Sequence, residues 1–180
     1  AIPTFAAFAV EFMAWYRQNH RPRSFERSVS AIKALVPMFG SMPLDQITTL
    51  AVERYKRDRL HKGRAPNTVK HELELLHHML RTAVRWEILA KHPAPDVAPP
   101  KVDQPRTRVL SLEEEALLLA ACSDHLRPLV QFALHTGLRR NELCSLTCAD
   151  LRRYPGFVVV ESQTAKSRRA RRIPLTPTAL

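Results

Sequence analysis

The chain of 180 residues is long enough for one large domain or two small ones, and its 28 Lys and Arg against 17 Asp and Glu give a formal net charge of +11. Its four glycines, Gly40, Gly63, Gly137 and Gly156, lie far apart, which excludes the phosphate-binding loops of nucleotide-dependent enzymes because those loops need closely spaced glycines. The excess of positive charge favours a polyanionic partner, most simply a nucleic acid.

Apolar residues recur at helical spacing in four segments of the first half of the chain. Thr4 is a candidate N-cap of the first segment, Gly63 is a candidate C-cap of the third, and Pro66 stands at the first turn of the fourth. We expect helices over residues 4–19, 24–37, 49–62 and 66–89. Four amphipathic helices on short links predict a compact bundle.

A proline-rich segment, residues 92–109, follows the fourth predicted helix. Its five prolines exclude a helix and favour an extended, semi-rigid connector. We therefore expect two modules, residues 1–91 and residues 110–180, joined by this connector. Both modules carry more basic than acidic side chains, so one polyanion can contact both.

The second module combines helices with strands. Ser111 and Glu114 form a capping-box pattern at the start of one predicted helix, and Gly137 ends the next. Further along, the period changes to that of two strands around a long polar turn. We expect helices over residues 112–122, 126–136 and 140–146, and strands over residues 157–161 and 171–175. The predicted fold class is mainly α, with a helical bundle followed by a partial α+β domain.

The most informative stretch is residues 132–151, FALHTGLRRNELCSLTCADL. Gly137 closes one helix and Arg139 opens the next, so the Arg139 guanidinium lies where backbone N–H groups also point outward, an arrangement that suits an anion. Glu142, three residues on, can hold or orient Arg139. An ordinary surface ion pair one turn apart explains the same residues equally well, so the pattern alone leaves both interpretations open.

The same stretch resembles the first signature box of the tyrosine recombinases, the phage integrase family. The matching residues are Thr136-Gly137-Leu138-Arg139-x-x-Glu142-Leu143-x-x-Leu146-x-x-x-Asp150. The predicted hairpin, with Lys166 in its turn and an Arg-x-Ile-Pro-Leu strand from Arg171, resembles the family's second catalytic element. The four-helix module resembles its SAM-like core-binding domain. The resemblance implies that domain over residues 1–91 and the first part of the catalytic domain over residues 110–180.

The resemblance also implies an activity. A tyrosine recombinase cleaves a DNA phosphodiester with a tyrosine nucleophile, leaving a 3′-phosphotyrosyl link and a free 5′-hydroxyl, in DNA integration and site-specific recombination. Because the covalent link conserves the bond energy, the reaction needs no ATP, and fixed arginines meet the phosphoryl charge without a metal. By this resemblance Arg139 binds the scissile phosphate, Lys166 protonates the leaving oxygen, and Glu142 supports the site without doing chemistry.

The family's remaining catalytic residues lie C-terminal to the hairpin: a His-x-x-Arg box, a further His or Trp, and the tyrosine. None of these follows residue 175 in this sequence. Its tyrosines are Tyr16, Tyr55 and Tyr154, and none is positioned to be the nucleophile. We therefore expect the 180 residues to be a truncated piece of a recombinase that cannot cleave DNA alone.

Basic residues in both modules are candidates for DNA contact. Five of the seven residues from Lys166 to Arg172 are basic, which indicates phosphate binding, although a solvated hairpin or a localisation signal has the same composition. In the first module a basic and polar cluster begins the fourth predicted helix, whose N-terminus also favours phosphate. The predicted DNA-binding residues are Arg140, Arg168, Arg169, Arg171, Arg172, Arg64, Asn67, Thr68, Lys70 and Arg27.

We expect neither a metal nor another cofactor. Among the eight histidines, His77 and His78 are adjacent and so face differently on a helix. Cys144 and Cys148 would need two further ligands to hold zinc, and we expect them to be small buried residues instead. Three cysteines in a chain of this size indicate a reducing, cytoplasmic compartment.

We expect the partner to be double-stranded DNA at attachment or recombination sites. A membrane is not expected, since the longest apolar run, residues 116–122, is too short to cross a bilayer. The resemblance implies a tetramer of the full-length protein on DNA, is compatible with a monomeric segment, and points to a nucleoid-associated protein of bacterial or phage origin. The alternative is a non-catalytic DNA-binding module, either an integrase remnant or a helical regulator, which a downstream His-x-x-Arg box and tyrosine would argue against.

Overall fold

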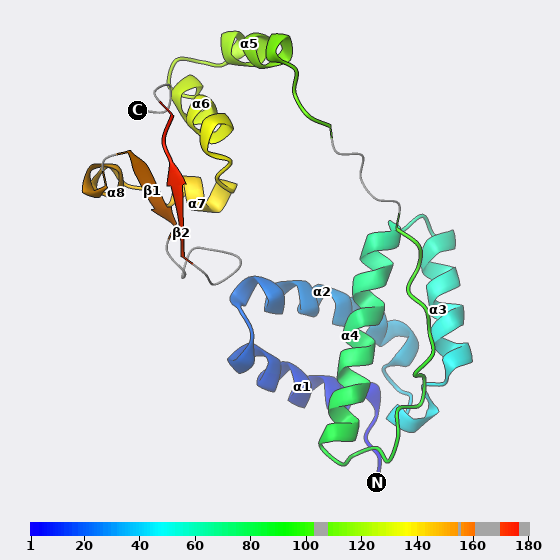
Figure 1. Cartoon of the computed structure of the whole chain (residues 1–180). Helices are drawn as coiled ribbons and strands as arrows, with labels where there is room; N and C mark the ends of the chain where they lie inside the picture. Colours follow the sequence, from blue (N-terminus) through cyan, green and yellow to red (C-terminus); the bar gives the residue numbers. More distant parts are fainter. Residues whose placement is uncertain (103–107, 155, 161–169, 177–180) are drawn as a thin grey trace. The chain divides into compact units, whose positions relative to one another are not determined.

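The computed structural model describes residues 1–102, 108–154, 156–160 and 170–176. By its internal contacts the chain divides into two compact units, unit 1 (Ala1–Pro105) and unit 2 (Arg106–Leu180), which we describe separately (Figure 1). The regular elements described in unit 1 are helices, and those in unit 2 are helices and one hairpin. The mainly α fold class is therefore confirmed.

Unit 1 contains the four predicted helices with shifted ends. They are α1 (Phe5–Asn19), α2 (Pro22–Phe39), α3 (Thr49–His61) and α4 (Pro66–Arg85), with a short 3-10 helix, η1 (Leu44–Gln46), between α2 and α3. The Thr4 hydroxyl caps α1 by accepting a hydrogen bond from the Ala7 N–H at 3.4 Å. Gly63 follows α3 with φ at 72°, a left-handed conformation that ends the helix.

Helix α4 ends at Arg85 rather than at residue 89 as expected. Glu87 adopts a left-handed conformation with φ at 60°, and the N–H groups of Ile88 and Leu89 turn back to the Ala83 carbonyl at 2.9 and 3.2 Å. Leu89 is nevertheless buried, because this turn returns it to the core. The apolar pattern therefore continues past the helix without helical structure.

The core of unit 1 lies where α4 packs against α1, α2 and α3. Its largest fully buried side chains on α1, α2 and α4 are Phe5, Phe8, Phe12, Leu35, Phe39, Leu73, Leu76, Met79 and Leu80. Burying each side chain of this size contributes on the order of 2 kcal/mol. Unit 1 therefore has an extensive apolar core of its own.

The first residues of the expected connector pack against unit 1. Ala94 and Val97 are buried in its core, and the Lys56 ammonium donates a hydrogen bond to the Ala98 carbonyl at 2.9 Å. Residues 92–98 therefore belong to unit 1. The sequence had placed them in a connector that begins at residue 92. Prolines exclude a helix here, but they leave the small apolar side chains between them free to cover the bundle.

Unit 2 is built from short elements in its described part. They are α5 (Leu112–Ala121), α6 (Arg127–Thr136), α7 (Arg140–Cys144), α8 (Cys148–Arg153), β1 (Phe157–Val160) and β2 (Arg171–Pro174), with β1 and β2 antiparallel. The capping box is confirmed, because Ser111 and Glu114 bond each other's backbone N–H at 3.1 and 3.2 Å. Helix α8 is not among the predicted elements, and Thr147 and Asp150 cap its start.

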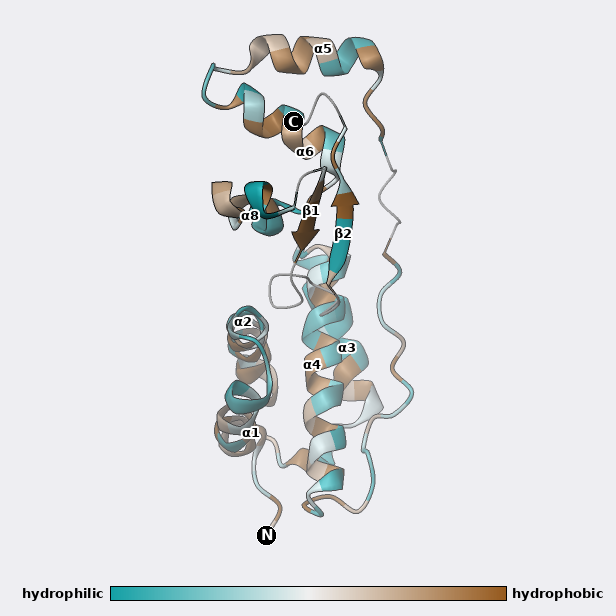
Figure 2. Ribbon diagram, turned by 60° about the vertical axis from the view of Figure 1, so that its left-hand side comes forward, coloured by the Kyte–Doolittle hydropathy of each residue, from teal (hydrophilic) through white to brown (hydrophobic). Residues whose placement is uncertain are grey.

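The core of unit 2 is small. Leu138 and Val160 form its centre, and Phe132, Leu143, Leu146 and Ile173 pack around them. Figure 2 shows β1 as hydrophobic, whereas β2 begins hydrophilic and becomes hydrophobic toward its end. The start of β2 therefore brings polar side chains next to this small apolar core.

The described helices of unit 2 expose much of their apolar surface to solvent. Helix α5 has no buried side chain, and its Leu112 and Leu117 are 83% and 70% exposed. In the described ranges no helix of either unit has the length and hydropathy to cross a membrane.

Candidate active site

The turn between α6 and α7 places Arg139 beside Glu142. Gly137 ends α6 with φ at 59°, a conformation that favours glycine, and the buried Leu138 anchors the turn in the core. Arg139 is the N-cap of α7 in an extended conformation, and Glu142 is the third residue of that helix. The Glu142 carboxylate accepts a hydrogen bond from the Arg139 backbone N–H at 2.9 Å, so this N–H is no longer available to an anion.

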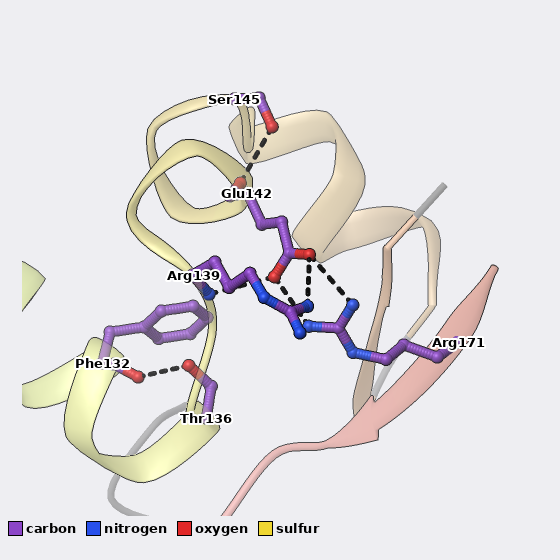
Figure 3. A network of polar contacts seen from close by, with 6 residues as sticks. All are labelled: Phe132, Thr136, Arg139, Glu142, Ser145 and Arg171. Carbon is purple, nitrogen blue, oxygen red and sulfur yellow. Dashed lines mark hydrogen bonds and ion pairs between the residues drawn. The ribbon is translucent and has the colours of Figure 1, made fainter. Parts of the chain in front are cut away.

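The Glu142 carboxylate is the centre of an ionic network (Figure 3). The Arg171 guanidinium donates to both of its oxygens, from Nη1 to Oε1 at 3.0 Å and from Nη2 to Oε2 at 2.6 Å. Arg139 donates from Nη1 to Oε1 at 3.2 Å. The Glu142 side chain is only 2% exposed. Two arginines, one before α7 and one on β2, therefore enclose a single buried carboxylate.

These arginines keep Glu142 ionised. The hydrogen bonds from Arg171, followed by those from the backbone and side chain of Arg139, lower the pKa of Glu142 to about 2, although burial acts in the opposite direction. The carboxylate is therefore charged at every physiological pH. A permanently charged acceptor can orient guanidinium groups, but it cannot exchange a proton during a reaction.

With respect to the described residues, Arg139 keeps most of its side-chain donors free for a ligand. Its side chain is 55% exposed, and within the described ranges only its Nη1 donates a side-chain hydrogen bond. A guanidinium carries five N–H donors in a planar fork that matches two oxygens of a phosphate. An ordinary surface ion pair does not describe this arrangement, because Glu142 is buried. The geometry suits an anion that meets Arg139 from the solvent side.

Arg171 and Arg172, which are neighbours on β2, extend from opposite faces of the hairpin. The register pairs Arg171 with Val160, which is buried, and Arg172 with Val159 on the other face. Arg172 is exposed. Arg171 was predicted to contact DNA, but its side chain is 33% exposed and its guanidinium is bound to Glu142.

Arg172 belongs to a row of stacked side chains that sequence reasoning missed. Its guanidinium lies 5.3 Å from the centre of the Phe157 ring. Phe157 stacks on Tyr154 with ring centres 5.2 Å apart and ring planes at 19°, and Arg153 lies 5.4 Å from the centre of the Tyr154 ring. We name these four residues the outer row. The available signal was Arg153 directly before Tyr154, with Phe157 three residues further on, because guanidinium groups stack on aromatic faces.

Of the remaining predicted residues of unit 2, the structure describes one, Arg140. Arg140 is exposed at the start of α7. Lys166, Arg168 and Arg169 lie outside the described residues, so their roles stay predictions.

Four of the five predicted DNA-binding residues of unit 1 lie near the start of α4, and the fifth, Arg27, lies on α2. Arg64, Asn67 and Thr68 are exposed there, and no side chain caps the helix. Pro66 has no N–H, and the N–H groups of Thr68 and Val69 donate to the Ala65 carbonyl, so the helix start offers an anion few backbone donors. Lys70 is half-buried, and its ammonium lies 3.9 Å from the Glu74 carboxylate, which offsets part of its charge.

A cleft of about 460 Å³ runs between α1, α2 and α4. Arg27 and Thr68 line it, so two of the predicted residues come together from different helices. His71 and His78 also line the cleft, and Tyr16 closes it from α1. The structure thus gathers part of the predicted set into one concave surface of unit 1.

Each of the three tyrosines is held by contacts within its own unit. Tyr16 and Tyr55 are buried in the core of unit 1. The Tyr55 hydroxyl donates to the Glu72 carboxylate at 2.7 Å, and burial, together with this hydrogen bond, raises the pKa of Tyr55. Tyr154 is held in the outer row.

Metal-binding side chains are scattered in the part of the chain that the structure describes. It contains no group of three or more His, Cys, Asp or Glu that could hold a metal ion. Cys144 and Cys148 are free and exposed, so the expectation that they are buried is wrong. Both lie at the ends of short helices near the surface of unit 2, where little apolar surface covers them.

Two family models match the chain, one in each unit. The phage integrase, N-terminal SAM-like domain, matches residues 4–58, and the phage integrase family matches residues 108–180. The second match contains the whole Arg139 and Glu142 turn.

Known proteins with similar sequences are integrases and recombinases. The integrase of Salmonella phage P22 is 32% identical over 119 residues, which cover 66% of this chain and 30% of that integrase. The tyrosine recombinase XerC of Xanthomonas campestris pv. campestris (strain B100) is 23% identical over 154 residues, which cover 83% of this chain and 48% of XerC. The chain thus spans less than half the length of each of these relatives.

Solved structures share the fold. A lambda integrase dimer bound to a COC′ core site matches with a TM-score of 0.81 and 20% identity, over 96% of this chain and 49% of that one. The Tn1549 transposon integrase in complex with transposon right end DNA matches with a TM-score of 0.82 and 19% identity, over 98% of this chain and 62% of that one.

Proposed function

The chain belongs to the phage integrase family of tyrosine recombinases, and we propose that it supplies the core-binding domain and the first part of the catalytic domain of an enzyme that cleaves and rejoins DNA at specific sites. The observation that carries the proposal is the exposed guanidinium of Arg139, which donates a hydrogen bond to the buried carboxylate of Glu142. The likeness to integrases whose structures contain DNA supports duplex DNA as the substrate.

In the proposed reaction a tyrosine oxygen attacks the scissile phosphorus, forms a 3′-phosphotyrosyl bond and displaces the 5′-oxygen. Because one phosphoester replaces another, the step needs no ATP. Arg139 donates hydrogen bonds to the phosphoryl oxygens, on which negative charge grows in the transition state. Lys166 delivers the proton that the departing 5′-oxygen needs. Glu142 transfers no proton, since its pKa of about 2 keeps it ionised.

Both units contribute DNA contacts in this proposal. Those of unit 1 are Arg27, Arg64, Asn67, Thr68 and Lys70. Those of unit 2 are Arg140, Arg168, Arg169 and Arg172, to which the outer row adds Arg153. Contacts of this kind neutralise phosphates and fix the position of the duplex. The full-length protein, which is of bacterial or phage origin, works as a tetramer on DNA in the cytoplasm, associated with the nucleoid.

We propose further that the 180 residues by themselves bind DNA without cleaving it. Two of the three tyrosines, Tyr16 and Tyr55, are buried in unit 1, and Tyr154 is stacked between Arg153 and Phe157. A nucleophilic tyrosine must reach the scissile phosphate. Incubation of the chain with a nicked suicide substrate should therefore yield no covalent protein–DNA product, and such a product would contradict this part of the proposal.

The test of the catalytic role uses a recombinase that carries these 180 residues together with a downstream His-x-x-Arg box and tyrosine. Arg139→Ala should reduce strand cleavage by about 10²–10³-fold, as expected for the loss of one transition-state donor, while most of the affinity for the site remains. Arg108→Ala is the matched control, because Arg108 is an exposed arginine of the same unit that pairs with Glu114. Unchanged cleavage by the Arg139→Ala enzyme would overturn the assignment.

A further inference from the structure

We propose that Arg171 is a positioning residue for the cleavage reaction, which acts by fixing the Glu142 carboxylate that in turn fixes the guanidinium of Arg139. The inference rests on the proposed function of Arg139. It replaces the prediction that Arg171 contacts DNA.

The first step is the contact between Arg171 and Glu142. Each oxygen of the carboxylate accepts a hydrogen bond from a different nitrogen of the guanidinium, at 3.0 and 2.6 Å. A two-point contact of this kind fixes the orientation of both groups, whereas a single contact leaves each free to rotate. The carboxylate is 2% exposed, so water competes little for these bonds.

The second step is the contact between Glu142 and Arg139. The fixed carboxylate holds Arg139 at two atoms, the backbone N–H at 2.9 Å and the side-chain Nη1 at 3.2 Å. Arg139 precedes a helix of only five residues and its side chain is 55% exposed. Little else in the described part of unit 2 restrains this guanidinium, so its orientation depends on the carboxylate.

The third step concerns charge. A lone Glu142 beside Arg139 would neutralise it and weaken its attraction for a phosphate. Arg171 supplies a second positive charge to the same carboxylate, so that the three groups together carry a net charge of about +1. Arg171 lies on the core side of the hairpin with Val160. The guanidinium through which this net positive charge is accessible to a phosphate is therefore that of Arg139.

The contact also ties two elements that are distant in the sequence. Arg171 begins β2 and Glu142 lies in α7, and their hydrogen bonds connect positions separated by 29 residues. A displacement of β2 relative to α7 is therefore transmitted to Arg139. In catalysis an error of about 1 Å in such a group can reduce the rate by about 100-fold.

The direct test compares Arg171→Ala and Arg171→Lys in the same recombinase. In single-turnover cleavage of saturating DNA, Arg171→Ala should slow cleavage by about 100-fold, while the Kd for the site rises no more than about threefold at fixed salt. Arg171→Lys keeps the charge but not the two-point contact, so its rate should lie between those of the wild type and Arg171→Ala. A large loss of affinity with an unchanged cleavage rate at saturation would mean that Arg171 contacts DNA, and would overturn the inference.

A double-mutant cycle with Glu142→Gln separates positioning from any direct role. If Arg171 acts through Glu142, adding Arg171→Ala to the Glu142→Gln enzyme should cost less than about threefold in cleavage rate, against about 100-fold alone. An undiminished effect of Arg171→Ala in the Glu142→Gln background would contradict the inference. If Arg139→Ala proves harmless, the proposed function itself fails, and the two failures are thus distinguishable.

A readout without DNA completes the test. In the 180-residue chain, carbon NMR of the Glu142 carboxyl should show the group still ionised at about pH 4, because its pKa is lowered to about 2. Arg171→Ala should move that pKa toward the ordinary glutamate value of 4.5, whereas Arg172→Ala, one residue further along β2, should leave it in place. If Arg171→Ala does not move the pKa, the Arg171 contact does not hold Glu142 and the inference is wrong.

Discussion

Glu72 and Glu142 are the two carboxylates buried in the described part of the chain, one in each unit, and each is held by an arginine from another element. Glu72, on α4, is bound by Arg59 of α3, just as Glu142 is bound by Arg171 of β2. An ionised carboxylate is stable away from water only where charged and polar donors satisfy it. Each unit therefore contains one ionic centre that fixes two elements against each other.

Acid should unfold unit 2 as Glu142 becomes protonated. Its pKa is about 2 in the folded chain against a usual 4.5, so the stability it contributes is complete above pH 4.5 and is lost as the pH falls toward 2. Hydrogen exchange of the Val158 and Val160 amides, measured across this range, should show the loss. In Glu142→Gln the protection factors of these amides, which correct for the intrinsic pH dependence of exchange, should be lower at pH 7 and change less with pH.

The control for this measurement is Asp124→Asn, because Asp124 is fully exposed. It should reproduce the pH profile of the wild type. An identical profile for Glu142→Gln and the wild type would show that Glu142 does not control the acid stability of unit 2.

Tyr55→Phe should destabilise unit 1 by about 1–2 kcal/mol, because it leaves the buried Glu72 with one hydrogen bond fewer. Urea unfolding followed by the fluorescence of Trp15 and Trp86, which both lie in unit 1, measures the effect. Tyr16→Phe is the matched control, since the Tyr16 ring is buried but its hydroxyl forms no hydrogen bond within the described ranges. Equal destabilisation by the two substitutions would contradict the role assigned to the Tyr55 hydroxyl.

Mild acid should loosen residues 92–98 from α4. The Ala94 N–H donates to Nδ1 of His92 at 3.1 Å, so neutral His92 carries its proton on Nε2 and can donate it to His77 Nδ1 at 3.3 Å. Burial, and secondarily the charge of Arg81, lowers the pKa of His77, and burial likewise lowers that of His92. Protonation of His77 removes the acceptor of the His92 proton, and protonation of His92 removes the acceptor of the Ala94 N–H. Protonation of both rings would also place two positive charges together.

Both lowered pKa values give the same sign of pH dependence. The unfolded chain binds protons more readily, so the contribution of these histidines to stability is complete above pH 6.5 and falls as the pH drops below it. The free energy of unfolding of unit 1 should decrease between pH 7 and 5, and His77→Phe should reduce that slope. The exposed His61 provides the control His61→Gln, and the prediction fails if both variants give the slope of the wild type.

DNA binding should depend steeply on salt, and the outer row should account for part of that dependence. Each phosphate contact removed lowers the slope of log K against log salt by about 0.9. Arg153→Gln and Arg172→Gln should each reduce the slope by up to this amount in fluorescence anisotropy with duplex DNA between 50 and 200 mM NaCl, values chosen about physiological ionic strength. Arg108→Gln should preserve the slope, and a slope unaffected in all three variants would remove the outer row from the interface.

Local sequence signals predicted most of unit 1, and their failures have physical causes. Thr4, Gly63 and Pro66 mark helix ends through backbone chemistry that acts within a few residues. The end of α4 was misplaced because Leu89 is buried by a turn that the apolar pattern cannot distinguish from another helical turn. Residues 92–98 were assigned to a connector because prolines report the absence of helix and nothing about packing.

The candidate site was predicted in part, and the missing part is the one that depends on long-range pairing. Arg139 and Glu142 are three residues apart, so their contact follows from local helix geometry. Which of Arg171 and Arg172 faces the core depends on how β2 pairs with β1, and the residues of β2 alone do not determine this register. The prediction therefore assigned both arginines to DNA contact, whereas in the structure the Arg171 guanidinium is hydrogen-bonded to Glu142.

The alternation of side chains along β2 has a consequence for changes in the length of the connection between the strands. A shift of β2 by one residue relative to β1 would exchange the faces of Arg171 and Arg172, so that an arginine would still lie on the face that carries Val160. The same shift would move Ile173 away from Val158, its partner across the sheet, and out of the small core of unit 2. Such a shift would leave an arginine on the core face but would lose the apolar pair of Ile173 and Val158, so this apolar pair favours the observed alignment of the hairpin more than the charges do.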